Sequence, residues 1–118
     1  MATDNAVVNN SQIDNRIYTW GPMANGDVGN AQAYTGTGDR TIQVTGTFGA
    51  GGSLQPEGSL DGVNWFQLKD PSNTAIAFTA AGLKAILEHA PFIRPHVTAG
   101  DGTTSLTCII SVRSTFYG

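Results

Sequence analysis

Histidine, cysteine and carboxylate side chains are the groups in this chain that could carry out chemistry. The two histidines, His89 and His96, lack the HxH spacing of paired metal ligands. With the single cysteine, Cys108, the chain cannot assemble the Cys and His ligands of a zinc cluster. We therefore expect neither a metal site nor a cofactor.

The acidic residues could supply paired carboxylates for acid–base catalysis, but most of them stand beside glycine or proline. There, a short acid hydrogen-bonds its own backbone and shapes a turn. Glu57 differs because it lies in a predicted strand, where we expect a cross-strand pair with Lys69 as readily as any chemical role. The candidates are Asp27, Asp39, Glu57, Asp61, Asp70, Glu88 and Asp101. No nucleophile or phosphate-loop motif accompanies them, so the sequence favours a protein that is not an enzyme.

The amino-acid composition and charge of the chain limit the kinds of partner that it is expected to bind. Charged residues are 13% of the chain, against about 25% in typical soluble proteins, and hydrophobic residues are 40%, enough for a core. The formal net charge is −3 and the cations are scattered, so no basic stripe predicts nucleic-acid binding. No apolar run approaches the roughly 18 residues of a membrane helix, and the N-terminus lacks the pattern of a secretory signal. We expect a protein made in the cytoplasm, with no nucleic-acid or membrane partner.

Alternating apolar residues place several strands. Thr41–Phe48 is the clearest, with Ile42, Val44 and Phe48 on one face. Gly46 on that inner face predicts a bulge or a close backbone approach. In the closing strand, Ser105–Thr115, Cys108 shares a face with other apolar residues, which predicts a buried structural thiol.

A hairpin is predicted within Leu54–Leu68. Its arms flank Asp61-Gly62, a pair that favours a type I′ turn because both residues tolerate positive φ. By alternation, Trp65 and Phe66 must face opposite sides of their strand. One can enter the core, and the other needs a cover, either a loop or a neighbouring subunit.

Together these patterns predict an all-β fold. We expect a single antiparallel β-sandwich or jelly-roll-like domain of seven to nine strands over residues 16–118. Residues 1–15 are expected to form an N-terminal arm or an edge strand. One short helix is expected near 82–89, with His89 capping its C-terminal end. Pro95 should move the strand Phe92–Thr98 toward a sheet edge or a bulge.

Two segments carry a family resemblance. They are Glu57–Leu68, EGSLDGVNWFQL, and Phe92–Val112, FIRPHVTAGDGTTSLTCIISV. A hairpin of this type, then an FIRP strand, then a glycine-rich turn into an alternating last strand resembles small β-sandwich proteins of tailed-bacteriophage virions. Capsid decoration (cement) proteins belong to that group. The resemblance covers roughly the C-terminal half of the chain.

The resemblance implies a homotrimer that binds the outer surface of an icosahedral head and stabilises contacts between major capsid subunits. The implied partners are therefore the major capsid protein and the chain itself. Candidate capsid contacts are Thr3, Asp4, Val7, Val8 and Ile13. Candidate trimer contacts are Trp20, Phe66, Phe116 and Tyr117.

Two alternatives stay open. The SLDGVNW hairpin is also similar to that of discoidin-type carbohydrate-binding modules, and Trp65 exposed beside Tyr34 on a concave rim would favour that function. The chain could also be another virion part, such as a head–tail or head-fibre component.

Overall fold

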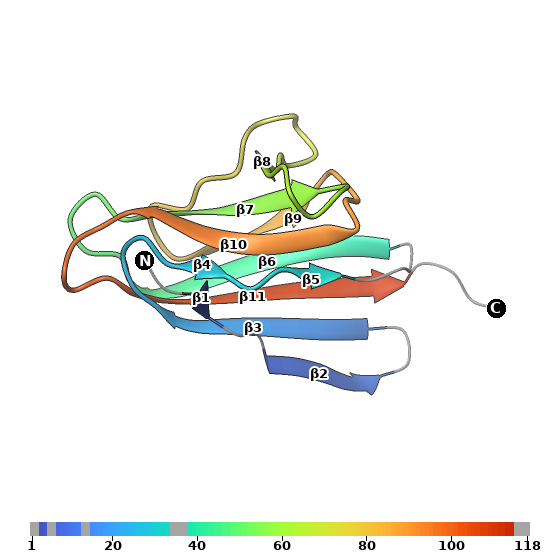
Figure 1. Ribbon diagram of the computed structural model, residues 1–118, viewed down its shortest axis with the longest axis horizontal. Coiled ribbons are helices and arrows are strands. Elements are labelled where there is room, and N and C mark those ends of the chain that lie inside the picture. The colour runs from blue at the N-terminus through green and yellow to red at the C-terminus, as the bar shows by residue number, and fades with distance from the viewer. Residues whose placement is uncertain (1–2, 5–6, 13–14, 34–37, 115–118) are drawn as a thin grey trace.

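The computed structural model describes residues 3–4, 7–12, 15–33 and 38–114. Within these residues, strands form two sheets that face each other (Figure 1). The strands are β1 (Thr3–Asp4), β2 (Val7–Gln12), β3 (Asn15–Met23), β4 (Val28–Gly29), β5 (Gln32–Ala33), β6 (Gly38–Thr47), β7 (Ser53–Ser59), β8 (Phe66–Gln67), β9 (Gly82–Ile86), β10 (Phe92–Ala99) and β11 (Ser105–Ser114). The predicted all-β sandwich is confirmed, with several strands of only two residues added to the expected set.

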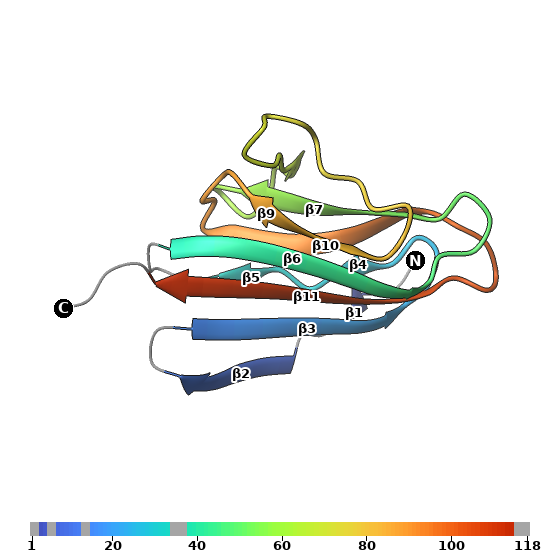
Figure 2. The same ribbon diagram turned by 180° about the vertical axis from the view of Figure 1, so that it is seen from behind.

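One sheet has the order β1-β4-β10-β7-β8, with β5 also paired to β10, and the other has the order β2-β3-β11-β6-β9. Figure 2 shows β2, β3, β11 and β6 side by side in that second sheet. The pairs are antiparallel except β1 with β4. The described N-terminal residues join both sheets, because β1 pairs with β4 and β2 is the edge strand beside β3.

The core fills the space between the sheets. Alternate residues of the central strands point inward, as the period of two in a strand requires. The fully buried apolar side chains of these strands are Trp20, Met23, Ile42, Val44, Leu54, Ile93, Val97, Leu106, Cys108 and Ile110. The predicted burial of Cys108 is confirmed, and burial raises the pKa of its thiol well above the usual range.

The predicted helix near 82–89 is wrong. Residues 82–86 form β9 instead, and the described residues contain no helix. β9 pairs with β6 from Val44↔Gly82 to Arg40↔Ile86, so it occupies the backbone hydrogen-bonding groups along that side of β6. Only Ile86 of β9 is buried, while Leu83 is 64% exposed. Leu83 and Ile86 therefore point in different directions, and His89 has no helix to cap.

Pro95 lies inside a sheet, so the predicted position at a sheet edge is wrong, whereas the alternative that was predicted with it, a bulge, is present in the same strand as a register shift between Val97 and Ala99. β10 pairs with β7 on one side and with β4 and β5 on the other. The nitrogen of Val97 donates to the carbonyl of Asp27, so Pro95, two residues earlier, turns its missing N–H toward the same side. On that side, Pro95 falls between the residues of β10 that pair with β4 and those that pair with β5, so no backbone N–H is required of it.

Gly46 confirms the predicted close approach. Its φ is +117°, and a Cβ there would lie 2.3 Å from the carbonyl oxygen of Ser105. We expect Gly46→Ala to lower the free energy of unfolding by about 3 kcal/mol, because strain and a clash add. Gly26→Ala is the matched control: its φ is +84° with nothing within 4 Å of the new Cβ, so strain alone costs about 1 kcal/mol. Urea unfolding measures both, and equal losses would contradict the close approach.

Candidate functional site

The β7–β8 hairpin is confirmed by the pairs Glu57↔Gln67 and Gly58↔Phe66. Its turn is longer than the predicted type I′ turn, because Gly62 has positive φ and Asp61 does not. Instead, the Asp61 carboxylate accepts hydrogen bonds from the backbone N–H groups of Val63, at 2.8 Å, and Asn64, at 2.9 Å. These bonds lower the pKa of Asp61 well below its usual range.

Ser59 completes this turn from the other side. Its hydroxyl accepts the backbone N–H groups of Asp61 and Gly62. The loop between the two strands is thus fixed by its own side chains. It carries large apolar groups outward: Leu60 is 81% exposed, Val63 76% and Phe66, at the start of β8, 70%. We call these three residues the hairpin tip.

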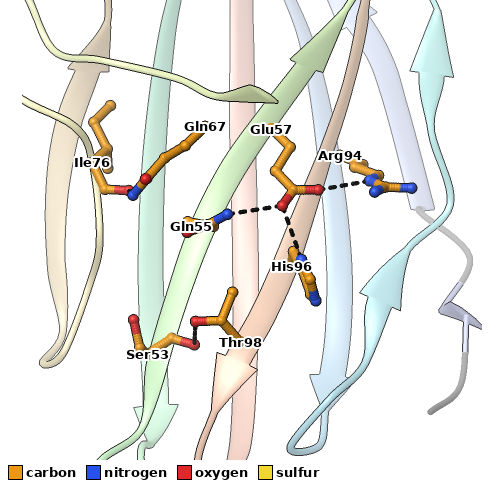
Figure 3. A network of polar contacts seen from close by, with 8 residues as sticks. All are labelled: Ser53, Gln55, Glu57, Gln67, Ile76, Arg94, His96 and Thr98. Atoms are coloured by element: carbon orange, nitrogen blue, oxygen red, sulfur yellow. Dashed lines mark hydrogen bonds and ion pairs between the residues drawn. The ribbon is translucent and has the colours of Figure 1, made fainter. Parts of the chain in front are cut away.

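The outer face of the sheet beside the hairpin holds a polar network centred on Glu57 (Figure 3). Its Oε1 accepts from Arg94 Nε at 2.9 Å, and its Oε2 accepts from Gln55 Nε2 at 2.8 Å. His96 Nδ1 lies 2.9 Å from Oε2. Because an ionised carboxylate only accepts, the Nδ1 carries the proton. The pairing of β7 with β10 places all four side chains on one face.

Glu57 is buried, and its environment fixes its charge. Burial acts to raise its pKa, but the hydrogen bonds from His96, Gln55 and Arg94 outweigh that effect and lower it. Arg94 is itself held in place, since its Cζ lies 4.2 Å from the centre of the Trp65 ring. Because the Glu57 carboxylate accepts hydrogen bonds from three side chains, it is suited to stabilising the structure rather than to exchanging protons.

The expected Glu57–Lys69 pair is wrong. Lys69 instead contacts Glu88, with Nζ–Oε2 at 2.7 Å, and its backbone N–H donates to Glu88 Oε1 at 2.7 Å. Glu57 lies in β7 and Lys69 follows β8, but the neighbouring strand β10 supplies the partners of Glu57, Arg94 and His96.

An apolar groove of about 690 Å³ lies on the other face of the hairpin. One wall comes from Gly58, Phe66 and Leu68, and the facing wall comes from the segment 88–90. Leu68 is buried, whereas Phe66, on the same face, is exposed. The groove is therefore the open end of the sandwich interior.

The second wall is anchored by Arg40 from β6. Arg40 Nη1 donates to the carbonyl oxygens of Glu88, at 3.0 Å, and Ala90, at 2.8 Å. Burial lowers the pKa of Arg40 to about 10, which leaves it charged at neutral pH. The N–H of Leu87 also donates to the carbonyl of Lys69 at 2.7 Å. Both walls of the groove are thus held by hydrogen bonds.

The expected interface residues fall in different places. Trp20 is fully buried, and its Nε1 donates to the backbone and side-chain oxygens of Asn30 at 3.0 Å, so it has no surface to offer a partner. Phe66 stands at the groove. Thr3 and Asp4 lie in β1, and Val7 and Val8 lie in β2. Ile13, Tyr34, Phe116 and Tyr117 lie outside the described residues.

Neither the Glu57 network on one face of the hairpin nor the exposed hairpin tip was predicted from the sequence. Arg94 and His96 alternate along FIRPHVT, which was a signal that they share the outer face of their strand. Leu60 and Val63 flank Asp61-Gly62 in a turn, where apolar residues are unusual, and that was the available signal for an exposed tip.

Comparison with known proteins gives no match to a family model, a curated protein or a solved structure. In the described part of the chain, no helix is long and apolar enough to cross a membrane. The same residues contain no group of three or more His, Cys, Asp or Glu side chains placed to hold a metal ion.

The Glu57 network predicts a pH-dependent stability. A carboxylate with a lowered folded-state pKa stabilises the fold above its unfolded pKa and loses this contribution as the pH falls through the folded pKa. We expect Glu57→Gln to cost about 2 kcal/mol at pH 7, and its difference from wild type to shrink below about pH 4.

Glu88→Gln is the matched control, because the Lys69–Glu88 pair is partly exposed and should contribute at most about 1 kcal/mol. Urea unfolding from pH 7 to pH 3 measures both variants. A Glu57→Gln defect that is unchanged across this range would contradict the network as described.

Proposed function

We propose that the chain is a non-enzymatic structural protein of a tailed-bacteriophage virion, a capsid decoration (cement) protein. After synthesis in the host cytoplasm, it binds the outer surface of an icosahedral head as a homotrimer and stabilises contacts between major capsid subunits. The observation that carries this proposal is the hairpin tip beside an apolar groove. Exposed apolar groups gathered in one place mark surfaces that bind other macromolecules.

The chemistry of the described site supports a binding role over catalysis. The buried carboxylate of Glu57 is saturated with donors, and Asp61 is occupied in its turn. Neither is placed to act on a substrate. The low share of charged residues, 13%, suits a protein that packs against close neighbours.

The resemblance to virion proteins supplies the finer part of the proposal. Its two segments fall on the β7–β8 hairpin and on β10–β11, and β7 pairs with β10 along its length. The hairpin and β10 are therefore neighbours in one sheet, β11 lies in the facing sheet, and the exposed tip lies within the first segment.

The carbohydrate-binding alternative requires an open aromatic face. The Arg94 guanidinium stacks over one face of the half-buried Trp65 ring, so that face is not open to a sugar. A head–tail or head-fibre role differs from decoration in symmetry and position on the particle, and particle binding distinguishes them.

The direct test mixes purified protein with expanded, DNA-free heads assembled from the major capsid protein of the same genome. We expect co-sedimentation that saturates at three-fold positions on the head surface, seen by cryo-electron microscopy. Binding restricted to the portal vertex would assign a head–tail role. No binding to heads, combined with retention on a glycan array, would favour the carbohydrate module.

A second test addresses the N-terminal segment. β2 is an edge strand, so deletion of residues 1–12 leaves β3 paired with β11. We expect this variant to keep the oligomeric mass of the full chain and to lose most of its binding to heads. Full occupancy by the shortened chain would contradict a capsid-contacting role for Thr3, Asp4, Val7 and Val8.

A further inference from the structure

We infer that residues 115–118, the four residues that follow β11, reach across the open end of the sandwich and seat the ring of Phe116 in the apolar groove of the same copy. The inference rests on the proposed function, because it divides the binding site between two occupants. Phe116 of the chain itself fills the groove, and a partner contacts the outer part of the hairpin tip.

β11 ends at the same end of the sandwich as the groove. Arg40 of β6 pairs with Val112 of β11 on one side and with Ile86 of β9 on the other. The same Arg40 holds the groove wall, segment 88–90, through two carbonyl oxygens. Figure 1 shows that β7, which carries the hairpin, and β11 run toward one common end. Ser114 therefore stands only two residues past the level of this wall.

The residues after Ser114 are long enough to reach the wall. Neighbouring strands lie about 4.8 Å apart and a strand rises about 3.3 Å per residue, so the Arg40 backbone, one strand away and two residues back, lies about 8 Å from Ser114. An extended chain advances about 3.5 Å per residue, so the backbone of Phe116 can lie about 7 Å from Ser114, and its ring reaches further. The wall that Arg40 holds is within that reach.

The alternation of β11 selects Phe116 over its neighbour Tyr117. The buried side chains of β11 follow a period of two that ends at Val112. Ser114 and Phe116 continue that period, whereas Tyr117 falls on the opposite face. Continued alternation therefore directs the ring of Phe116 toward the facing sheet at the open end, and the ring of Tyr117 away from it.

The groove is suited to an aromatic ring. Phe66, Leu68 and Ala90 give it apolar walls, and Phe66 is 70% exposed among the described residues. Its volume of about 690 Å³ falls in the range of sites that enclose sizeable apolar groups, roughly 300–1,000 Å³. A ring placed there removes its own surface and that of Phe66 from water.

The charges at the groove favour an uncharged occupant. Lys69 and Glu88 pair with each other, and Asp61 accepts hydrogen bonds within its own turn. A charged occupant would have to compete with these pairings, whereas the side chains of 115–118 carry no charge. Their attachment to β11 also gives them a high effective concentration at the groove, which a free partner lacks.

Cysteine labelling tests whether the groove is covered. His89→Cys places a thiol on the exposed groove lining, while the native Cys108 is fully buried and should stay unlabelled. We expect a charged thiol reagent to label this variant about tenfold more slowly than the same variant without residues 115–118, because docked Phe116 excludes the reagent. Far-ultraviolet circular dichroism checks that each variant folds.

Two substitutions in the His89→Cys background separate Phe116 from its neighbour. Phe116→Ser should speed labelling as much as the deletion does. Tyr117→Ser is the matched control and should leave labelling slow. Labelling that is unaffected by the deletion, or equally affected by both substitutions, would overturn the inference. Protection that is lost on dilution would place Phe116 in the groove of a second copy and overturn the same-copy arrangement.

This inference and the decoration role can fail separately. Val63 is 76% exposed and does not line the groove, so Val63→Asp should abolish binding to expanded heads and leave labelling slow. A protected groove in a chain that ignores heads would keep this inference and reject the decoration role. A chain that binds heads, but whose labelling does not depend on Phe116, would keep the decoration role and reject this inference.

Discussion

The register between β7 and β10 is the constraint on which the rest of this structure depends. It sets Arg94 opposite Glu57 and Pro95 opposite Pro56. A slip of one residue would turn every side chain of the strand to the other face, bringing the charges into the core and Ile93 and Val97 into water. The Glu57 hydrogen bonds on the outer face and the apolar contacts on the inner face therefore favour the same register. The two prolines fit because neither is required to donate across this pair.

That register decides what the hairpin presents. Counting along β8 from Glu57↔Gln67, the residues alternate, so Trp65 joins the polar network on the outer face and Phe66 turns toward the sandwich interior. The segment 88–90, held by Arg40, meets β7 at Gly58, where a Cβ would lie 2.9 Å from the Ala90 Cβ, and the apolar groove opens beside this contact toward Phe66. One face of the hairpin is thus clamped by charge and hydrogen bonds, while the other is left apolar and open. This division supports a protein that binds a partner through the apolar face of the hairpin. The hydrogen bonds and ion pairs of the opposite face stabilise the hairpin itself.

Alternation in the sequence predicted the sandwich, the β7–β8 hairpin, the burial of Cys108 and the close approach at Gly46, since each depends on local pattern. The predictions that failed depend on distant partners. Residues 82–86 carry a helix-like spacing, but the side of β6 that they pair with cannot be read from their own sequence. Glu57 found Arg94 and His96, more than thirty residues away, rather than Lys69. Trp20 lies in the core rather than at the surface, because its large ring fills the space between the two sheets. Which strands pair to form those sheets cannot be read from the sequence around Trp20.

The central claim is that the open end of the sandwich is the binding surface. Hydrogen–deuterium exchange, followed by mass spectrometry on dilute and concentrated protein, tests it most directly. The account predicts that association slows exchange in residues 60–69 and 87–90. Little change is expected in the loops at the other end of the sheets, 48–52 and 100–104 (Figure 1). Slowed exchange confined to those opposite loops, with none at the hairpin tip, would contradict it.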